Sequence, residues 1–203
     1  GIKQRHKAAP DEYTSQFGTK AALQALERAG LKPEDIDIII CATTTPDQIM
    51  PSTGALIQAQ IGAVNAAGMD VFAACSGFLY GLTMVESMIK TGQIQYALVI
   101  GAEVLTKYVD YTDRGTCVIF GDGAGAAVVG PVPEGKGILA TKIRSDGRYE
   151  EQLYAPGGGT KLGTTHETID NGEHFFKMKG NELFKVAVRS MADISAEMIE
   201  KAG

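Results

Sequence analysis

One cysteine lies at the point where a strand pattern changes into a helix pattern. The segment reads Asp70-Val-Phe-Ala-Ala-Cys75-Ser-Gly-Phe78. A thiol at such a corner lies near unpaired backbone N–H groups and the positive end of the helix dipole. Both favour the thiolate, which is the nucleophilic form. The segment therefore predicts a nucleophile elbow, although it differs from the hydrolase pattern G-x-S-x-G. An inert buried thiol is the alternative that the pattern leaves open.

Buried strands and helices alternate on both sides of this corner, and they would have to position the thiol. We expect helices at residues 15–29, 52–61, 77–91 and 180–202 from apolar residues at helical spacing. We expect strands at 36–42, 69–74, 96–101, 118–129 and 137–145, and a long loop region at 146–172. Near-continuous apolar runs between helices are typical of buried parallel strands. The pattern predicts an α/β fold with mostly parallel strands.

The composition narrows the functional classes. The chain has 203 residues, of which 44% are hydrophobic and 21% charged, which is ordinary for a globular protein with a sizeable core. Its net charge of −5 gives no support for nucleic-acid binding. No apolar run reaches the length of a membrane span, so we expect no membrane partner. Three cysteines without framework or zinc spacing indicate reduced thiols, no metal site and a cytoplasmic protein.

Two further motifs could bind a ligand. The segment Thr112-Asp-Arg-Gly-Thr116 offers an arginine suited to pairing with phosphate or stacking on a purine, while an exposed loop arginine is the plainer interpretation. The segment Phe120-Gly-Asp-Gly-Ala-Gly-Ala-Ala127 fits neither phosphate-loop pattern, and it leads into a strand. Its glycines therefore indicate close packing of backbones between layers.

Taken together and in order, these motifs resemble the ketoacyl synthase III enzymes of the thiolase superfamily. The resemblance also rests on Gly1-Ile-Lys-Gln-Arg-His6, Ala42-Thr-Thr-Thr45 and Gly180-Asn-Glu-Leu-Phe-Lys-Val-Ala187, and it covers essentially the whole chain. It implies a layered αβαβα fold, thiolase-like, with mixed sheets and two similar halves. Residues 1–145 would then be the first half without its first strand. Residues 146–203 would be a connecting loop region and the start of the second half, in an excerpt of a longer polypeptide.

The resemblance also implies an activity. The cysteine would take an acetyl or other short acyl group from acyl-coenzyme A. It would then condense that group with malonyl-acyl carrier protein to give 3-ketoacyl-acyl carrier protein, the first condensation of fatty-acid synthesis. The enzyme would be a cytoplasmic homodimer without a cofactor. The family's catalytic histidine and asparagine would lie beyond Gly203, and none of His6, His166 and His174 occupies their motifs. We expect the last two to be exposed.

Residue by residue, the resemblance assigns Cys75 as the nucleophile. Arg114 and Gly115 would contact coenzyme A, and Met50 would reach the acyl pocket of the partner subunit. The pantetheine tunnel would be lined by Ile119, Phe120, Gly180, Asn181 and Phe184. Two alternatives stay open. One is another condensing enzyme of the superfamily, such as a polyketide starter or hydroxymethylglutaryl-coenzyme A synthase type. The other is a non-catalytic homologue that serves in binding or dimerisation.

Overall fold

The computed structural model describes residues 1–203 and divides the chain into two compact units. The first, called the sheet unit here, comprises His6–Val104 and Asp122–Ile143. The second, called the helix unit, comprises Gly1–Arg5, Leu105–Gly121 and Arg144–Gly203.

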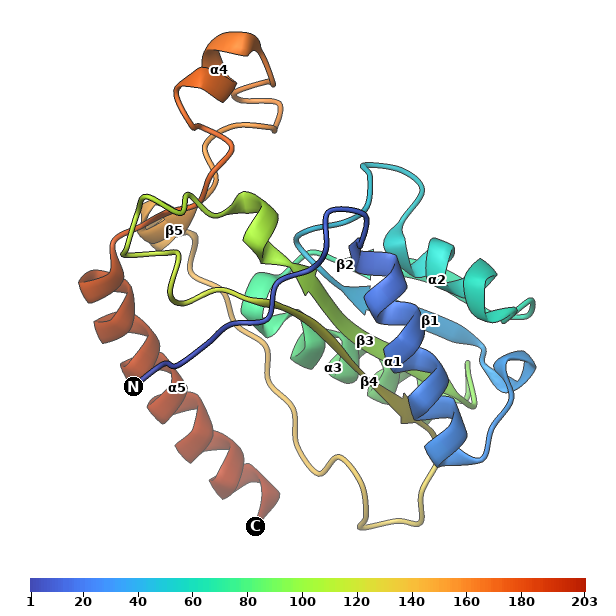
Figure 1. Ribbon diagram of the computed structural model, residues 1–203. Coiled ribbons are helices and arrows are strands. Elements are labelled where there is room, and N and C mark those ends of the chain that lie inside the picture. Colours follow the sequence, from blue (N-terminus) through green and yellow to red (C-terminus); the bar gives the residue numbers. More distant parts are fainter. The chain divides into compact units, whose positions relative to one another are not determined.

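The sheet unit is built on a four-stranded mixed sheet (Figure 1). Its strands lie in the order β2-β1-β3-β4 and comprise Ala67–Val71, Ile38–Ala42, Ala97–Val104 and Asp122–Val129, respectively. Strand β1 runs parallel to both β2 and β3, whereas β4 pairs antiparallel with β3. All five residues of β1 are buried, as expected for a central parallel strand covered on both faces.

Helices cover both faces of this sheet. Helices α1 (Thr14–Ala29) and α2 (Thr53–Ile61) pack on one face, and α3 (Gly77–Lys90) packs on the other (Figure 1). Alternate residues of β1 divide between the two cores: Ile39 and Cys41 join α1 and α2, while Ile38 and Ile40 join α3. This is the two-residue period of a strand, and it confirms the predicted α/β class.

The helix unit contains one long helix and several short elements. Helix α5 (Gly180–Ala202) follows a two-stranded antiparallel ladder of β5 (Leu153–Tyr154) and β6 (Lys177–Met178). The short helix α4 (His166–Asp170) lies between those two strands in the sequence. Two 3-10 helices, η3 (Leu105–Tyr108) and η4 (Gly147–Gln152), complete the unit.

Several expectations from the sequence are wrong or need new bounds. The strands expected at 69–74 and 118–129 comprise Ala67–Val71 and Asp122–Val129. Residues 137–145 form no strand, because their backbone pairs with neither sheet. The region 146–172 is not wholly loop, since it contains η4, β5 and α4. The glycines of the motif at 120–127 do not mark close backbone packing: a Cβ added at Gly123 or Gly125 would meet no atom within 4 Å. The proposed division at residue 145 into family halves stays a prediction.

Candidate active site

Cys75 lies at a sharp turn between β2 and α3, as the sequence predicts. Strand β2 ends at Val71, and a 3-10 helix, η2 (Ala74–Ser76), carries the cysteine into α3. Ala74 has a φ of 45°, and it is the chain's single non-glycine residue with positive φ. An alanine in this left-handed region is strained by about 1–3 kcal/mol. The strained turn leaves Cys75 exposed.

Two glycines of α3 let the helix approach the sheet closely behind this turn. A Cβ added at Gly77 would lie 2.9 Å from the Cβ of Ala42 in β1. One turn later, a Cβ at Gly81 would lie 2.9 Å from Cγ1 of Val99 in β3. Carbon atoms make their optimal contacts at about 3.5–4.0 Å. The absence of side chains at these two positions therefore sets how near the helix, and with it Cys75, lies to the sheet.

The backbone N–H groups of the turn differ in whether they already donate a hydrogen bond within the chain. The Ser76 N–H donates to the carbonyl of Ala73, and the Gly77 N–H donates to the carbonyl of Ala74. The Cys75 N–H makes no hydrogen bond to another group of the chain. A free N–H on the nucleophile itself is a suitable donor for an oxyanion formed when its sulfur attacks a carbonyl.

The other two cysteines have different surroundings. Cys41 is fully buried in β1, and this burial raises the pKa of its thiol far above the ordinary range, with Asp70 and Glu103 adding to the effect. Such a thiol stays protonated and unreactive. Cys117 is half-buried, and none of the three cysteines forms a disulfide. Of the alternatives left by the sequence pattern, the inert buried thiol therefore describes Cys41 and not Cys75.

Met50 lies at the tip of the loop between β1 and α2, in the same unit as Cys75. Its side chain is 76% exposed, and that of its neighbour Ile49 is 91% exposed. Met50 therefore fills no gap in its own core. Two such apolar side chains side by side at a loop tip are an exposed patch that is open to contact with another molecule.

The segment around Arg114 belongs to the helix unit and is shaped by two aspartates. Asp110 accepts hydrogen bonds from the hydroxyl and N–H of Thr112, which together lower its pKa. Asp113 accepts from the N–H of Gly115 at 2.8 Å and from the hydroxyl of Thr116 at 2.7 Å. These bonds form the local turns typical of aspartate. They leave the Arg114 side chain exposed and without a hydrogen bond or ion pair in the chain.

Arg5 is a residue that the sequence analysis missed. Its Nε donates to the carbonyl of Ile119 at 2.9 Å, although 114 residues separate the two in the sequence. This contact brings a second exposed guanidinium to the segment that carries Arg114. In the sequence, Arg5 belongs to the segment Gly1–His6 that carries the resemblance and to the basic run at residues 3–7, but neither assigns it a role.

The other residues that the resemblance assigns to a pantetheine tunnel fall into two groups. Phe120 packs against Phe176, with ring centroids 5.4 Å apart, and Phe176 stacks on Tyr108 at 5.9 Å. Gly180 and Asn181 begin α5 and are exposed, and Phe184 one turn later is 68% exposed. The structure therefore gathers Phe120 into an aromatic cluster and leaves the three α5 residues on an open helix face.

The histidines do not all behave as expected. His166 is exposed at the start of α4, but His174 is half-buried, and the expectation of exposure is wrong for it. Its ring lies against Phe175, with centroids 3.9 Å apart, and its Nδ1 is buried without a hydrogen-bond partner. The aromatic run His174-Phe175-Phe176 places this histidine among rings, which the polar character of the preceding loop did not indicate.

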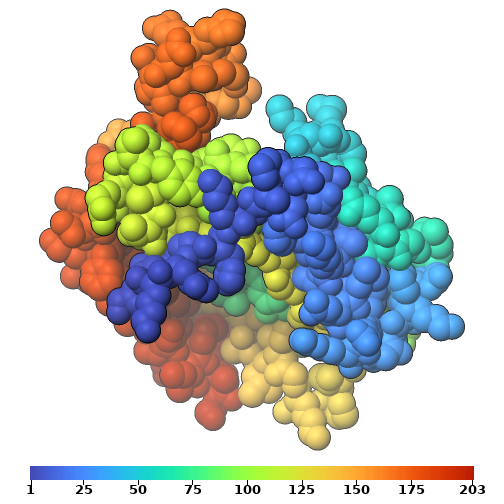
Figure 2. All heavy atoms as spheres, viewed as in Figure 1, coloured from blue at the N-terminus to red at the C-terminus, as the bar shows by residue number.

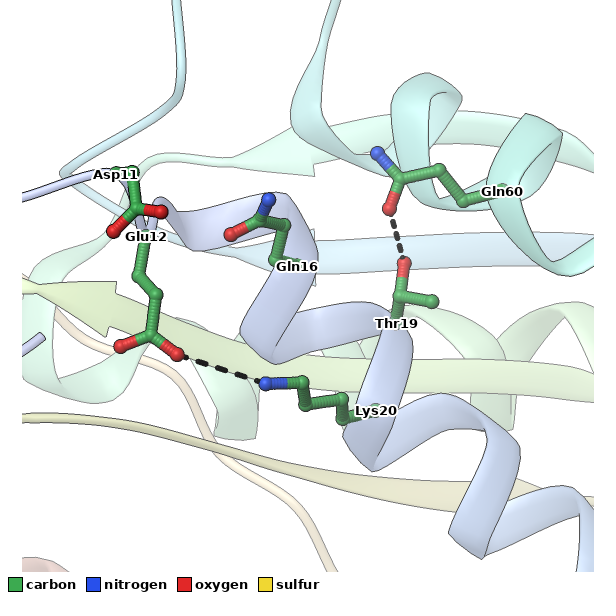
Figure 3. Close-up of a pocket in the computed structure, with 6 residues that line it drawn as sticks. All are labelled: Asp11, Glu12, Gln16, Thr19, Lys20 and Gln60. Atoms are coloured by element: carbon green, nitrogen blue, oxygen red, sulfur yellow. Dashed lines mark hydrogen bonds and ion pairs between the residues drawn. The ribbon is translucent and has the colours of Figure 1, made fainter. Parts of the chain in front are cut away.

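A polar pocket of about 420 Å³ lies elsewhere on the sheet unit (Figure 3). It is lined by Asp11, Glu12, Gln16, Thr19, Lys20 and Gln60. Several of these side chains bond to one another: Lys20 lies 3.7 Å from Glu12, and the Thr19 hydroxyl donates to Gln60 at 2.6 Å. The pocket contains no cysteine and none of the predicted site residues, so we do not regard it as the active site.

Comparisons with known proteins find enzymes of the kind that the sequence motifs resemble. Residues 69–147 match the family model of 3-oxoacyl-[acyl-carrier-protein] synthase III. The whole chain is 48% identical to the beta-ketoacyl-[acyl-carrier-protein] synthase III of Caldanaerobacter subterraneus and 50% identical to that of Clostridioides difficile. Over its whole length the chain is therefore similar to 3-oxoacyl-[acyl-carrier-protein] synthase III enzymes. It spans 61% of the length of both relatives, in line with the expected excerpt.

Two solved structures of similar enzymes superpose over the whole chain. The synthase III of Aquifex aeolicus superposes with a TM-score of 0.88 at 47% identity, and the chain covers 61% of it. The priming beta-ketosynthase of the R1128 polyketide pathway superposes with a TM-score of 0.85 at 31% identity, and the chain covers 60% of it. The thiolase-like fold predicted from the motifs is confirmed. No helix in the chain is both long and apolar enough to span a membrane.

Proposed function

We propose that the protein containing this chain is a condensing acyltransferase with Cys75 as its nucleophile. The observation that carries the proposal is the exposed thiol on a strained turn, with its own N–H unpaired. The substrate of the first step is the thioester of a short acyl-coenzyme A, and the acceptor is malonyl-acyl carrier protein. Support for the carrier protein comes from the names of the relatives, which are beta-ketoacyl-[acyl-carrier-protein] synthases. Acyl-coenzyme A and the malonyl group are what the family resemblance implies.

The first step is a thioester exchange. The Cys75 thiolate attacks the acyl carbonyl carbon, and a new carbon–sulfur bond forms as the carbonyl oxygen takes up negative charge. The Cys75 N–H donates to that oxygen. The bond to the coenzyme sulfur then breaks, and coenzyme A leaves as a thiolate that takes a proton. Exchange between two thioesters is nearly balanced in free energy, so a thiol suits this task better than a hydroxyl.

The second step consumes the acyl-cysteine. The bond between the malonyl carboxylate and its α-carbon breaks and releases carbon dioxide, and the electron pair stays on the α-carbon as an enolate. That carbon attacks the acyl carbon, and the bond to Cys75 breaks, which regenerates the thiolate and gives 3-ketoacyl-acyl carrier protein. The histidine and asparagine of this step are proposed to lie beyond Gly203, as the family resemblance implies. The residues described here therefore account for acylation only.

The residues of the helix unit are proposed to bind the acyl carrier of the first step. Arg114 is exposed and without a partner, which leaves its guanidinium able to pair with phosphate or stack on adenine. Gly115 lies beside it in the turn held by Asp113. Ile119, Phe120, Gly180, Asn181 and Phe184 are proposed to line the pantetheine tunnel. Arg5, held at the carbonyl of Ile119, adds a second positive charge to the same segment.

Met50 is proposed to close the acyl pocket of a partner subunit in a homodimer. The support is its position at an exposed, apolar loop tip, since a monomer gains nothing from exposing two neighbouring large apolar side chains. The cytoplasm is the proposed compartment. Three cysteines without a disulfide support it, because thiols stay reduced there.

Acyl transfer to the thiol is the direct test. The full-length protein and its Cys75→Ser variant are incubated with radiolabelled acetyl-coenzyme A, and the labelled peptide is mapped. We expect label on Cys75 that thiol-specific cleavage releases, and no such label in the variant. Label on Cys41 or Cys117 would overturn the assignment. An unlabelled but folded protein would favour a non-catalytic homologue.

The second candidate is priming of polyketide synthesis, which the likeness to the R1128 ketosynthase favours. Both candidates share the acylation step and differ in their carrier protein. Acylated enzyme offered malonyl groups on a fatty-acid carrier protein and on a polyketide carrier protein distinguishes them by which product forms.

A further inference from the structure

Three consecutive threonines fasten the Met50 loop to a single carboxylate. Glu103 lies near the end of β3. Its Oε1 accepts the Thr44 N–H at 2.8 Å and the Thr44 hydroxyl at 3.0 Å. Its Oε2 accepts the Thr45 hydroxyl at 2.6 Å and the Thr43 hydroxyl at 3.4 Å. Hydrogen bonds to an ionised carboxylate are about twice as strong as neutral ones.

The same limb of the loop has further attachments that fix its direction. The Thr45 hydroxyl accepts the Val104 N–H at 2.9 Å and donates its own hydrogen to Glu103. Because the hydroxyl has a single hydrogen, these two bonds fix its orientation. The Thr45 carbonyl accepts the hydroxyl of Thr14 in α1. Two residues later, the Asp47 carboxylate accepts the Ser15 N–H at 2.9 Å. The limb is thus held against both β3 and α1.

The other limb is held by a second carboxylate. Asp70 in β2 accepts the N–H groups of Thr53 and Gly54, both at 2.7 Å, at the start of α2. Between these two anchored ends lie residues 48–51, and the segment around residue 50 stands out from the sheet unit in the space-filling view (cyan in Figure 2). The tip of the loop is therefore exposed, while hydrogen bonds anchor the loop at both ends.

We propose that Glu103 is a positioning residue that holds this loop so that Met50 limits the length of the acyl group. The inference rests on the proposed role of Met50 in the partner's acyl pocket. All four hydrogen bonds of the Glu103 carboxylate go to the loop. Its removal therefore loosens the limb that carries Met50. A loosened tip no longer presents a fixed wall to the acyl chain.

The test measures selectivity, which a merely structural role would leave unchanged. In the full-length enzyme, kcat/KM is measured for acetyl- and octanoyl-coenzyme A in Met50→Ala, Glu103→Gln and Thr44→Val. Glu27→Gln is the matched control, since it removes an exposed charge from α1. We expect the octanoyl-to-acetyl ratio to rise about tenfold in Glu103→Gln, which is the lower end of the discrimination that a hydrophobic pocket achieves for one methylene. The ratio rises less in Thr44→Val and stays unchanged in Glu27→Gln.

The double variant Met50→Ala/Glu103→Gln sharpens the test. Because both changes act through the same side chain, the second should add little to the ratio set by the first. Full additivity would show that Glu103 acts elsewhere and would overturn the inference. If Glu103→Gln does not fold, Thr44→Val carries the test, because it keeps the carboxylate and the Thr44 N–H bond.

The failure of this inference is distinguishable from that of the proposed function. A ratio that moves in Met50→Ala but not in Glu103→Gln or Thr44→Val would overturn the role of Glu103 alone. A ratio that moves in none of them would remove Met50 from the pocket and the inference with it. Neither outcome touches the acylation of Cys75, which the labelling experiment measures separately.

Discussion

Replacing Gly77 by alanine tests whether the close approach of α3 to the sheet positions Cys75, the proposed nucleophile. The backbone of Gly77 is helical, with φ −56° and ψ −40°, so alanine introduces no backbone strain. The added Cβ would lie 2.9 Å from the Cβ of Ala42 and 3.6 Å from the carbonyl oxygen of Val71. Restoring an ordinary carbon–carbon contact requires a shift of about 0.6–1.1 Å. Cys75 lies two residues before the helix position that must move.

The magnitude follows from two opposing effects. Overpacking of a tight contact costs about 1–3 kcal/mol, and the higher helix propensity of alanine returns about 0.5–1 kcal/mol. We expect the free energy of unfolding to fall by about 0.5–2 kcal/mol. The effect on chemistry should be larger, because a displacement of about 1 Å at a reacting group can cost about a hundredfold in rate.

Gly81→Ala is the matched variant. Its Cβ would lie 2.9 Å from Val99 and 3.4 Å from Ile40, on the same face of α3 but one turn farther from Cys75. Single-turnover acylation by acetyl-coenzyme A and urea unfolding are measured for both variants of the full-length enzyme. We expect similar losses of stability, with the acylation rate falling about a hundredfold in Gly77→Ala and much less in Gly81→Ala. Equal losses of rate in the two variants would refute the positioning argument, as would full activity of Gly77→Ala.

Three further predictions follow from the site. Iodoacetamide at pH 8 should label Cys75 and leave Cys41 unlabelled in the folded protein, because burial raises the Cys41 pKa and keeps that thiol protonated. Mass spectrometry of the peptides identifies the labelled cysteines, and label on Cys41 would contradict the prediction. Asp70→Asn should lower the free energy of unfolding by about 1–2 kcal/mol, since the amide can accept only one of the two N–H groups at the start of α2. Arg114→Ala should raise KM for acetyl-coenzyme A about tenfold while the alkylation rate of Cys75 stays unchanged; an unchanged KM would remove Arg114 from the coenzyme site.

Local patterns predicted much of the fold. The change from strand to helix at Cys75 was visible because apolar strand formers give way to small residues and then to helical spacing. The C-terminal stop of the first helix was visible in Gly30, which takes a φ of 67°. Helix α5 was predicted with its observed bounds. These features depend on neighbours in the sequence, where propensity and periodicity act.

Features that depend on distant contacts were not predictable. The sequence gives no sign that Ala74 adopts positive φ, because alanine is not a residue that favours it. The bond from Arg5 to Ile119 spans 114 residues. Residues 137–145 contain the apolar residues of a strand but pair with no other strand. The sequence pattern of a segment does not show whether a partner strand is present. The burial of His174 depends on ring packing in the helix unit rather than on its polar neighbours in sequence.

The carboxylates near the site show why residue type alone does not identify the chemistry. Asp47, Asp70 and Glu103 all lie near enough to Cys41 to raise the pKa of its thiol, and in a sequence such acids suggest acid–base catalysis. Each instead accepts backbone N–H groups: Asp47 and Asp70 near the starts of α1 and α2, and Glu103 from the Met50 loop. In these positions the carboxylates fix the N–H groups that they accept. They are therefore suited to holding the framework in place, and the exposed Cys75 remains the proposed nucleophile of this unit.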